Sequence, residues 1–291
     1  MTLKIRNYQD DDSSKLEQLL KDTGLYYKSI DKKKILKNKI EENPESIIVA
    51  EYDNKLVGTV FAIYDLWNPM IFHLGVHPDH RNKGIGSKLM DEAEKRLKAR
   101  GVEEVTLFVE EENNKAMDFY KNRGWEDCGK TFCMKKKNIK KNKKSEVQIK
   151  MSIPIRNYQN NDSSKLKQLL KDIGIYYKPL DKKEIFKNKI EDNPESIIVV
   201  EDNGKLVGTV FVIYDLWNPM IFHLGVHPDH RNKGIASKLT YEAEGRLKAK
   251  GVKEVTLFVE EENNKAIDFY KKRGWEICNK NYAMAKRFKK Y

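Results

Sequence analysis

The chain has 291 residues, of which 34% are charged and 39% are hydrophobic, so its length allows two globular domains with strongly solvated surfaces. No apolar run reaches the length of a membrane span, and the segment from Met1 to Ile5 contains no apolar signal region. The three cysteines, Cys128, Cys133 and Cys278, lack the paired spacing of a metal site, so we expect no metal. Such sparse cysteine usage favours a reducing, cytoplasmic location.

The formal net charge of +12 suggests nucleic-acid binding, but much of this charge lies in one segment. Residues 135–150 contain eight lysines and one acid, Glu146, which is a net +7. A nucleic-acid-binding domain carries its basic residues on a folded face, whereas a lysine run without aromatics is typical of a solvated linker. We therefore expect neither a nucleic-acid partner nor a membrane partner.

The chain is an internal duplication, because residues 5–134 recur at 155–284 with a constant offset of 150. About four positions in five are identical, and a period this long indicates repeated domains rather than a solenoid. We predict one domain at 1–134, a lysine-rich linker at 135–151 and a second domain at 152–291. Charge repulsion favours an extended linker, and the sequence leaves open whether the two domains pack as an intramolecular pseudo-dimer.

The patterning of each copy alternates short apolar runs with amphipathic helical segments that begin at polar capping residues. The predicted elements of the first copy are, in chain order, a strand at 5–8, a helix capped by Asp12, a second helix capped by Asp31, a hairpin at 47–50 and 56–62, a strand at 71–76, a helix from about 85, a strand at 104–109, a helix after Asn113 and a weaker strand at 125–134.

Residues 71–89 are the central stretch of each copy. Residues 71–76 form an apolar run typical of a buried strand, and Pro78 ends it because proline cannot donate a ladder hydrogen bond. Gly84 and Gly86 follow, and then a helical pattern begins. The first turn of a helix has unpaired N–H groups and a positive dipole end, and glycine lets a phosphate approach the backbone. The stretch predicts a phosphate site, although glycines that serve only packing remain an alternative.

The spacing of these glycines narrows the kind of phosphate site. No Gly-Lys-Ser/Thr follows four residues after a glycine, so the stretch is not a Walker loop. The third glycine of a dinucleotide fingerprint is also absent. Instead, Arg81-Asn82-Lys83-Gly84-Ile85-Gly86 resembles the acetyl-CoA-binding motif Arg/Gln-x-x-Gly-x-Gly/Ala of the GCN5-related N-acetyltransferase (GNAT) superfamily.

A second motif at residues 113–125 is similar to that family's signature Asn-x-x-Ala-x-x-x-Tyr-x-x-x-Gly-aromatic. Two signatures in order are more specific than either alone. The resemblance implies an α/β fold of the α+β type with two GNAT-like domains. Each would be a mixed, mostly antiparallel, splayed sheet flanked by helices, with acetyl-CoA as co-substrate in the gap between the strands at 71–76 and 104–109.

The resemblance also implies which residues bind the coenzyme. The backbone of residues 74–76 would pair with the pantetheine arm, residues 81–87 would hold the pyrophosphate, and Asn113 would contact the pantetheine. The implied coenzyme-binding residues of both copies are Leu74, Gly75, Val76, Arg81, Asn82, Lys83, Gly84, Ile85, Gly86, Ser87 and Asn113, with Leu224, Gly225, Val226, Arg231, Asn232, Lys233, Gly234, Ile235, Ala236, Ser237 and Asn263.

Two kinds of catalytic residue are implied. Tyr120 and its copy Tyr270 align with the family's tyrosine that protonates the leaving sulfur, although a core tyrosine would fit the same helix. His73 and His223 are candidate general bases, because a neutral imidazole accepts a proton near pH 7. A buried, hydrogen-bonded histidine is the alternative, and a β-bulge here would reverse the face on which it lies.

Two further interpretations of polar residues near the site remain. A metal site from His73, His77, His80 and Asp79 is disfavoured, because Pro78 prevents one helix from presenting them together. The run Glu110–Glu112 could attract a cationic acceptor, but a charge run is usually solvated.

The acceptor pocket is expected opposite the coenzyme, where aromatic rings and one carboxylate suit an amine with an apolar body. The predicted acceptor-binding residues are Tyr26, Tyr27, Asp65 and Trp67, with Tyr176, Tyr177, Asp215 and Trp217. Related protein N-terminal acetyltransferases often carry arginine where Glu110 stands, which disfavours a protein terminus as acceptor. A small amine, a polyamine, an aminoglycoside-like compound and a peptide all remain open.

Three functions follow from these features. The first is an acetyl-CoA-dependent N-acetyltransferase that moves the acetyl group directly to a primary amine, with one site per domain. The second is a non-catalytic acyl-CoA sensor of the same fold, and the third is a nucleic-acid module driven by the lysines. Asn113, Tyr120 and their copies favour the first. Two competent sites are expected, since residues 63–85 are unchanged at 213–235 and the family motif tolerates Ala236 in place of Gly86.

Overall fold

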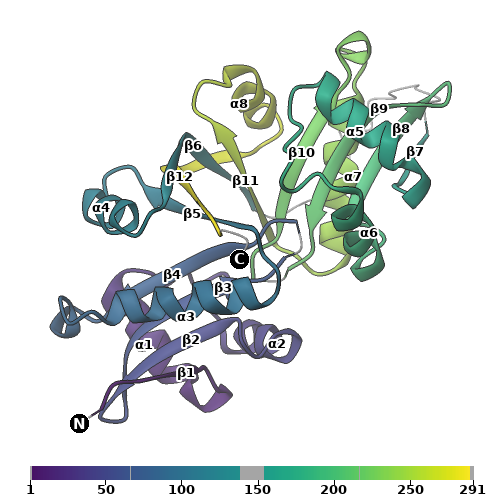
Figure 1. Ribbon diagram of the computed structural model, residues 1–291. Coiled ribbons are helices and arrows are strands. Elements are labelled where there is room, and N and C mark those ends of the chain that lie inside the picture. The colour runs from purple at the N-terminus through teal and green to yellow at the C-terminus, as the bar shows by residue number, and fades with distance from the viewer. Residues whose placement is uncertain (1, 66, 138–153, 216, 289–291) are drawn as a thin grey trace. The chain divides into compact units, whose positions relative to one another are not determined.

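The computed structural model describes residues 2–65, 67–137, 154–215 and 217–288, which form two compact units (Figure 1). Unit 1 comprises Met1–Lys130 and Asn281–Tyr291, and unit 2 comprises Thr131–Lys280. Most of the predicted linker, residues 138–151, lies outside the described residues. Residues 135–137, also predicted as linker, instead end strand β6 (Glu126–Lys137).

Unit 1 is a mixed sheet with the strand order β1-β2-β3-β4-β5-β12. Its neighbouring strands are antiparallel except for the parallel pair β4–β5. Its elements are β1 (Lys4–Asn7), η1 (Asp10–Asp12), α1 (Ser13–Thr23), α2 (Lys33–Glu42), β2 (Ile47–Tyr52), β3 (Lys55–Ile63), β4 (Met70–Val76), η2 (Pro78–His80), α3 (Ile85–Ala99), β5 (Glu104–Glu110), α4 (Asn114–Asn122) and the last part of β12 (Glu276–Arg287).

Unit 2 repeats this arrangement with the strand order β7-β8-β9-β10-β11-β6. Its elements are β7 (Ile155–Asn157), η3 (Asn160–Asp162), α5 (Ser163–Asp172), α6 (Lys183–Asp192), β8 (Ile197–Asp202), β9 (Lys205–Ile213), β10 (Met220–Val226), η4 (Pro228–His230), α7 (Ile235–Ala249), β11 (Glu254–Glu260), α8 (Asn264–Lys271) and the last part of β6. The predicted fold class and order of elements are thereby confirmed.

The last strand of each sheet comes from the other repeat. Residues 281–287 of β12 pair with β5 in unit 1, and residues 131–137 of β6 pair with β11 in unit 2. Met284 accordingly completes the apolar core of unit 1, and Met134 completes that of unit 2. The predicted strand at 125–134 exists, but its second half does not close the sheet of its own repeat.

Helices cover both faces of the unit 1 sheet, and two glycines show how closely they pack. A Cβ atom on Gly58 would lie 2.9 Å from the Leu89 side chain of α3. A Cβ on Gly75, in the neighbouring strand, would lie 2.7 Å from Leu25, just after α1. Because Gly75 pairs with Thr59, the residue after Gly58, the two glycines face opposite sides of the pleated sheet. Helices α3 and α1 therefore lie on opposite faces.

The sheet splays where the site was predicted. Strands β4 and β5 pair through Met70 and Thr106 near their starts, and no register pair follows along the described remainder of the two strands. Unit 2 has the same single pair, Met220 with Thr256. The backbone at the ends of β4 and β10 is thus left without a neighbouring strand on that side, which is the splay that the family resemblance implied.

Candidate active site

The turn between β4 and α3 is built by two residues with left-handed backbone. Asn82 has φ of 62° and Gly84, which caps α3, has φ of 73°. No side chain caps this helix start, and a Cβ on Gly84 would meet nothing within 4 Å. Open space beside uncapped helical N–H groups fits an anion.

Two basic side chains are fixed to this turn through backbone carbonyls. Arg81 donates from Nε to the carbonyl of Val76 at 3.1 Å, and Lys83 donates from Nζ to that of Asp79 at 3.0 Å. Arg231 repeats the first contact at 3.2 Å in unit 2. Both charges therefore stay near the start of α3, and the donor set present suits a diphosphate.

The candidate tyrosines lie on the helices after the splayed strands. Tyr120 and Tyr270 are 8% and 7% exposed and pack edge-on against Trp125 and Trp275. Burial raises the pKa of both phenols well above the ordinary value. Each hydroxyl therefore keeps its proton at neutral pH, as a proton donor requires.

Asn113 has a structural role in addition to its predicted one. Its side chain caps α4 by accepting a hydrogen bond from the Ala116 N–H at 3.1 Å, and Asn263 does the same for α8. The cap uses the side-chain oxygen of each asparagine, so the side-chain NH2 group is the part that this cap leaves available to a ligand.

The candidate histidine occupies a β-bulge, because the register of β3 with β4 shifts between Phe72 and Gly75. His73 has a φ of 49° and His223 has a φ of 46°, a strained conformation for a non-glycine residue. Such strain persists only where surrounding contacts hold it, and it is common at functional sites.

A buried carboxylate lies against each of these histidines, with a hydrogen bond in unit 1 and an ion-pair distance in unit 2. Asp31 Oδ2 lies 3.1 Å from His73 Nε2 and also accepts the Tyr27 N–H at 2.7 Å. In unit 2, Asp181 lies 3.4 Å from His223 Nε2 and accepts the Tyr177 N–H at 2.6 Å. The side chains of both aspartates have no exposed surface. An Asp–His pair fixes the orientation and tautomer of the imidazole.

The sequence profile of the acetyltransferase (GNAT) family matches this chain twice, at residues 13–125 and 164–275. The chain belongs to the GNAT family of acetyltransferases. The two matches coincide with the two copies of the turn, the splayed strands and the tyrosine helix described above.

Relatives and solved structures agree with this membership. An acetyltransferase of Yersinia pestis is 32% identical over 124 residues, which are 43% of this chain and 88% of that protein. One from Pectobacterium atrosepticum is 32% identical over 128 residues, 43% of this chain and 91% of its own. These relatives thus correspond to one repeat.

Two solved structures share the fold over nearly the whole chain. A GCN5-related N-acetyltransferase from Sphaerobacter thermophilus has a TM-score of 0.64 at 16% identity and covers 98% of this chain and 95% of its own. A tandem GNAT protein from the clavulanic acid biosynthesis pathway has a TM-score of 0.60 at 12% identity, with full coverage of both chains. At these identities the likeness concerns the fold alone.

Within this GNAT chain, the predicted acceptor residues do not all lie at one surface. Tyr27 is 48% exposed, and its ring centroid lies 5.8 Å from that of His73. Trp67 is only 4% exposed, and its backbone N–H donates a hydrogen bond to the Asp65 carboxylate at 2.9 Å. Unit 2 repeats the buried tryptophan and its turn with Trp217 and Asp215. Asp65 and Trp67 thus shape the loop before β4, and their contact with an acceptor stays a prediction.

Asp31 is a site residue that the sequence analysis missed. It was expected to cap the second helix, but the cap of α2 is Lys32 and the Asp31 carboxylate turns to His73. The same holds for Asp181, since Lys182 caps α6. The only signal was that an aspartate follows the tyrosine turn in both copies.

Three further predictions concern a metal site, a membrane span and the run Glu110–Glu112. Within the described ranges, no group of three or more His, Cys, Asp or Glu residues could hold a metal ion, and no helix there is long and apolar enough to cross a membrane. Glu111 of the run Glu110–Glu112 pairs with Lys130 at 2.6 Å. That glutamate is therefore engaged within unit 1.

Proposed function

We propose that each unit is an acetyl-CoA-dependent N-acetyltransferase that moves the acetyl group directly to a primary amine. Proteins of this family typically use acetyl-CoA. The observation that carries the proposal is that both units combine the splayed strands, the uncapped helix start and the Asp–His pair. The absence of disulfides among the cysteines, all three of which carry thiols, supports a cytoplasmic location.

The donor side of unit 1 fits the coenzyme. The unpaired end of β4, residues 74–76, offers backbone groups to the pantetheine arm. The start of α3, with Arg81, Lys83 and Ser87, offers N–H groups, charge and a hydroxyl to the diphosphate. When bound there, acetyl-CoA supplies the thioester that is the acetyl donor.

The protein then has two protons to move. His73, with Nε2 held by Asp31, carries its lone pair on Nδ1 and takes a proton from the acceptor ammonium. The amine nitrogen forms a bond to the acetyl carbon as the carbon–sulfur bond breaks. Tyr120, which burial keeps protonated at neutral pH, gives its phenolic proton to the leaving thiolate. His223, Asp181 and Tyr270 take these roles in unit 2.

A non-catalytic acyl-CoA sensor would need only the donor side. The repeated pair of a strained histidine and a buried aspartate, together with a protonated tyrosine, has no purpose in such a sensor. These groups favour an enzyme, and the named relatives are acetyltransferases.

Replacing both tyrosines tests this function. The double variant Tyr120→Phe/Tyr270→Phe keeps the edge-on ring packing and should lower turnover by about 10²–10⁴-fold, the usual contribution of a positioned acid. Thiol release from acetyl-CoA over a panel of primary amines measures it. Acetyl-CoA affinity, measured by calorimetry, should stay within about twofold. Full turnover in the double variant would remove the acid role, and no coenzyme binding at millimolar concentration in the unsubstituted chain would overturn the proposal.

A further inference from the structure

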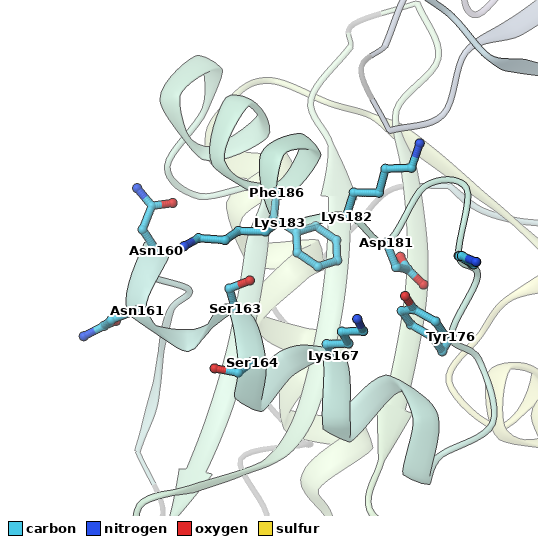
Figure 2. A pocket seen from close by; sticks show the side chains of 11 residues that line it. Asn160, Asn161, Ser163, Ser164, Lys167, Tyr176, Asp181, Lys182, Lys183 and Phe186 are labelled. Carbon is cyan, nitrogen blue, oxygen red and sulfur yellow. The ribbon is translucent and has the colours of Figure 1, made fainter. Parts of the chain in front are cut away.

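A pocket of about 580 Å³ lies at the starts of helices α5 and α6 in unit 2 (Figure 2). Four lysines line it, and they come from three different segments: Lys167 of α5, Lys178 of the turn after it, and Lys182 and Lys183 at the start of α6. Asp181 is the one carboxylate among its lining residues. The pocket therefore carries an excess of positive charge.

The charge of Asp181 is already engaged. Its carboxylate is buried, accepts the Tyr177 N–H and lies 3.4 Å from His223. It therefore belongs to both the pocket lining and the Asp–His pair, which places the pocket one residue away from His223, the proposed general base. Figure 2 shows Asp181 and Tyr176 together on one side of the pocket, with Lys167, Ser163 and Ser164 between them and the asparagines.

The backbone adds to the attraction for an anion. Ser163 and Ser164 are the first two residues of α5, and Lys183 is the first of α6, so both helices begin at the pocket. Helix α6 has no side-chain cap, whereas α5 directly continues η3, whose start carries the Gln159–Asp162 capping box. Unpaired N–H groups of a first turn and the positive end of the dipole favour an anion, and the lysines strengthen this field.

The corresponding surface of unit 1 carries more carboxylates, so the excess of positive charge is specific to unit 2. Asp10, Asp11 and Glu17 correspond to Asn160, Asn161 and Lys167, so three carboxylates are replaced by two amides and an ammonium group. The one opposite exchange near it, Lys34 to Glu184, concerns a residue that does not line the pocket.

These exchanges also remove the partners of two lysines. In unit 1, Lys33 lies 3.7 Å from Asp10, and Lys21 pairs with Glu17 at 2.7 Å. Their counterparts Lys183 and Lys171 form no ion pair with any residue in the part of unit 2 that the structure describes. Both Lys167 and Lys171 instead lie near the Tyr176 ring, 5.7 and 5.5 Å from its centroid. Four lysines against one carboxylate leave an excess of positive charge in the pocket, which an anionic ligand would stabilise.

We propose that this pocket binds a phosphate or carboxylate group of the amine that unit 2 acetylates, which makes the acceptor of unit 2 an anionic amine. The proposal rests on the acetyltransferase function above. An acceptor whose anionic end lies among the lysines can extend past Asp181 and present its amine to His223. The ammonium proton passes to His223, and Tyr270 protonates the thiolate, so the transfer balances as before.

Three amines that share a three-carbon chain test the acceptor class: 3-aminopropyl phosphate, 3-aminopropanol and 1,3-diaminopropane. The full chain with Tyr120→Phe reports on unit 2 alone. We expect kcat/KM for the phosphate compound to exceed that for the alcohol by at least about tenfold, the effect of one charge-assisted hydrogen bond. Introducing the unit 1 residues, Asn160→Asp, Asn161→Asp and Lys167→Glu, should abolish this preference.

The reciprocal chain provides the matched control. With unit 2 silenced by Tyr270→Phe, the exchanges Asp10→Asn, Asp11→Asn and Glu17→Lys should raise the preference of unit 1 for the phosphate compound. Turnover without preference for the phosphate compound in unit 2 would overturn the anionic-acceptor proposal and leave the acetyltransferase function standing. Absence of turnover with every amine in the unsubstituted chain would count against that function instead.

Binding without acetyl-CoA gives a readout independent of catalysis. Calorimetric titration of the full chain with 3-aminopropyl phosphate should show affinity that falls about tenfold in the chain with Asn160→Asp, Asn161→Asp and Lys167→Glu. Equal affinity in both chains, or no measurable binding to either, would overturn the proposal whatever the turnover assay gives.

Discussion

Units 1 and 2 have nearly the same turn at the proposed coenzyme site but differ at the surface proposed for the acceptor. Residues 63–85 are unchanged at 213–235, and both turns show the same left-handed residues and the same arginine contact to the end of the strand. Four exchanges that alter charge, at Asp10, Asp11, Glu17 and Lys34, lie around the starts of the first two helices, and the other exchanges are spread over the remaining elements. A duplicated enzyme can keep one coenzyme while its two copies select different acceptors, because the two ligands contact different elements.

A second difference concerns Arg123 and its counterpart Arg273, which contact helices α3 and α7. In unit 1, Arg123 pairs with Asp91 at 2.5 Å and lies 3.6 Å from Glu94. In unit 2, Tyr241 replaces Asp91, and Arg273 turns to the Ser237 hydroxyl and the Phe269 ring. One exchange thus moves a guanidinium from a buried glutamate to the start of α7.

The largest predicted effect concerns these buried glutamates. Glu244 is bound by Lys136 at 2.8 Å and by the Trp275 indole, whereas Glu94 has Lys286, the Trp125 indole and Arg123. Lys136→Met should destabilise unit 2 by about 3–5 kcal/mol, because it leaves a buried carboxylate without a cation. Lys286→Met should cost unit 1 less, since Arg123 remains. Hydrogen exchange of β11 and β5 amides measures the two units separately.

Adding Glu244→Gln to the Lys136→Met chain is the control. Glutamine can still accept the indole hydrogen bond but carries no charge, so most of the lost stability should return. Equal losses in the two units would show that Arg123 does not support Glu94.

A smaller effect should be equal in the two units. Burial alone would raise the pKa of Asp12 and Asp162, but hydrogen bonds from Arg6 and Arg156 outweigh it and hold the pKa of each below its ordinary value. This stabilisation is present above about pH 4, the unfolded-state range, and is lost as pH falls through the lower folded-state pKa.

Asp12→Asn should therefore cost about 1–3 kcal/mol at pH 7 and progressively less below pH 4. Asp162→Asn should give the same profile in unit 2. Urea unfolding of each chain across this pH range provides the measurement, and a loss independent of pH would contradict the ionic role of these aspartates.

The sequence predicted the parts of the site that are local. The strand, glycine turn and helix at 71–89 could be predicted because one short stretch carries every residue that builds them. The Asp31–His73 pair could not, since its members are 42 positions apart and an aspartate before a helix ordinarily predicts a cap.

The sequence could not predict that the last strand of each sheet comes from the other repeat, and the reason is a different one. The two copies of the final strand both place a methionine where the core needs one, at Met134 and Met284. Apolar periodicity specifies which residues face a core, but near-identical repeats offer two equivalent cores. The apolar pattern alone does not choose between them.

The exchange of Asp91 for Tyr241 should have a modest effect on coenzyme binding. Arg273 lies beside Ser237, a predicted pyrophosphate ligand, so it adds positive charge at the start of α7. Tyr241→Asp should draw Arg273 away and weaken CoA binding to unit 2 by about two- to fivefold, the scale of an exposed ion pair. Asp91→Tyr should strengthen binding to unit 1. Two-site calorimetric titration with CoA measures both, and unchanged affinities would show that this arginine does not contribute.

The smallest effect concerns Gly86, which corresponds to Ala236. A Cβ there would lie 3.7 Å from Phe119 and 3.8 Å from Val76, ordinary contact distances, and the residue is helical. Gly86→Ala should stabilise unit 1 by about 0.4–1 kcal/mol and leave CoA affinity within about twofold. Gly84→Ala is the contrast, since its φ of 73° strains an alanine despite the open space around it, and it should destabilise the turn and weaken CoA binding. Equal effects of the two changes on thermal unfolding would show that the left-handed backbone of Gly84 does not require glycine.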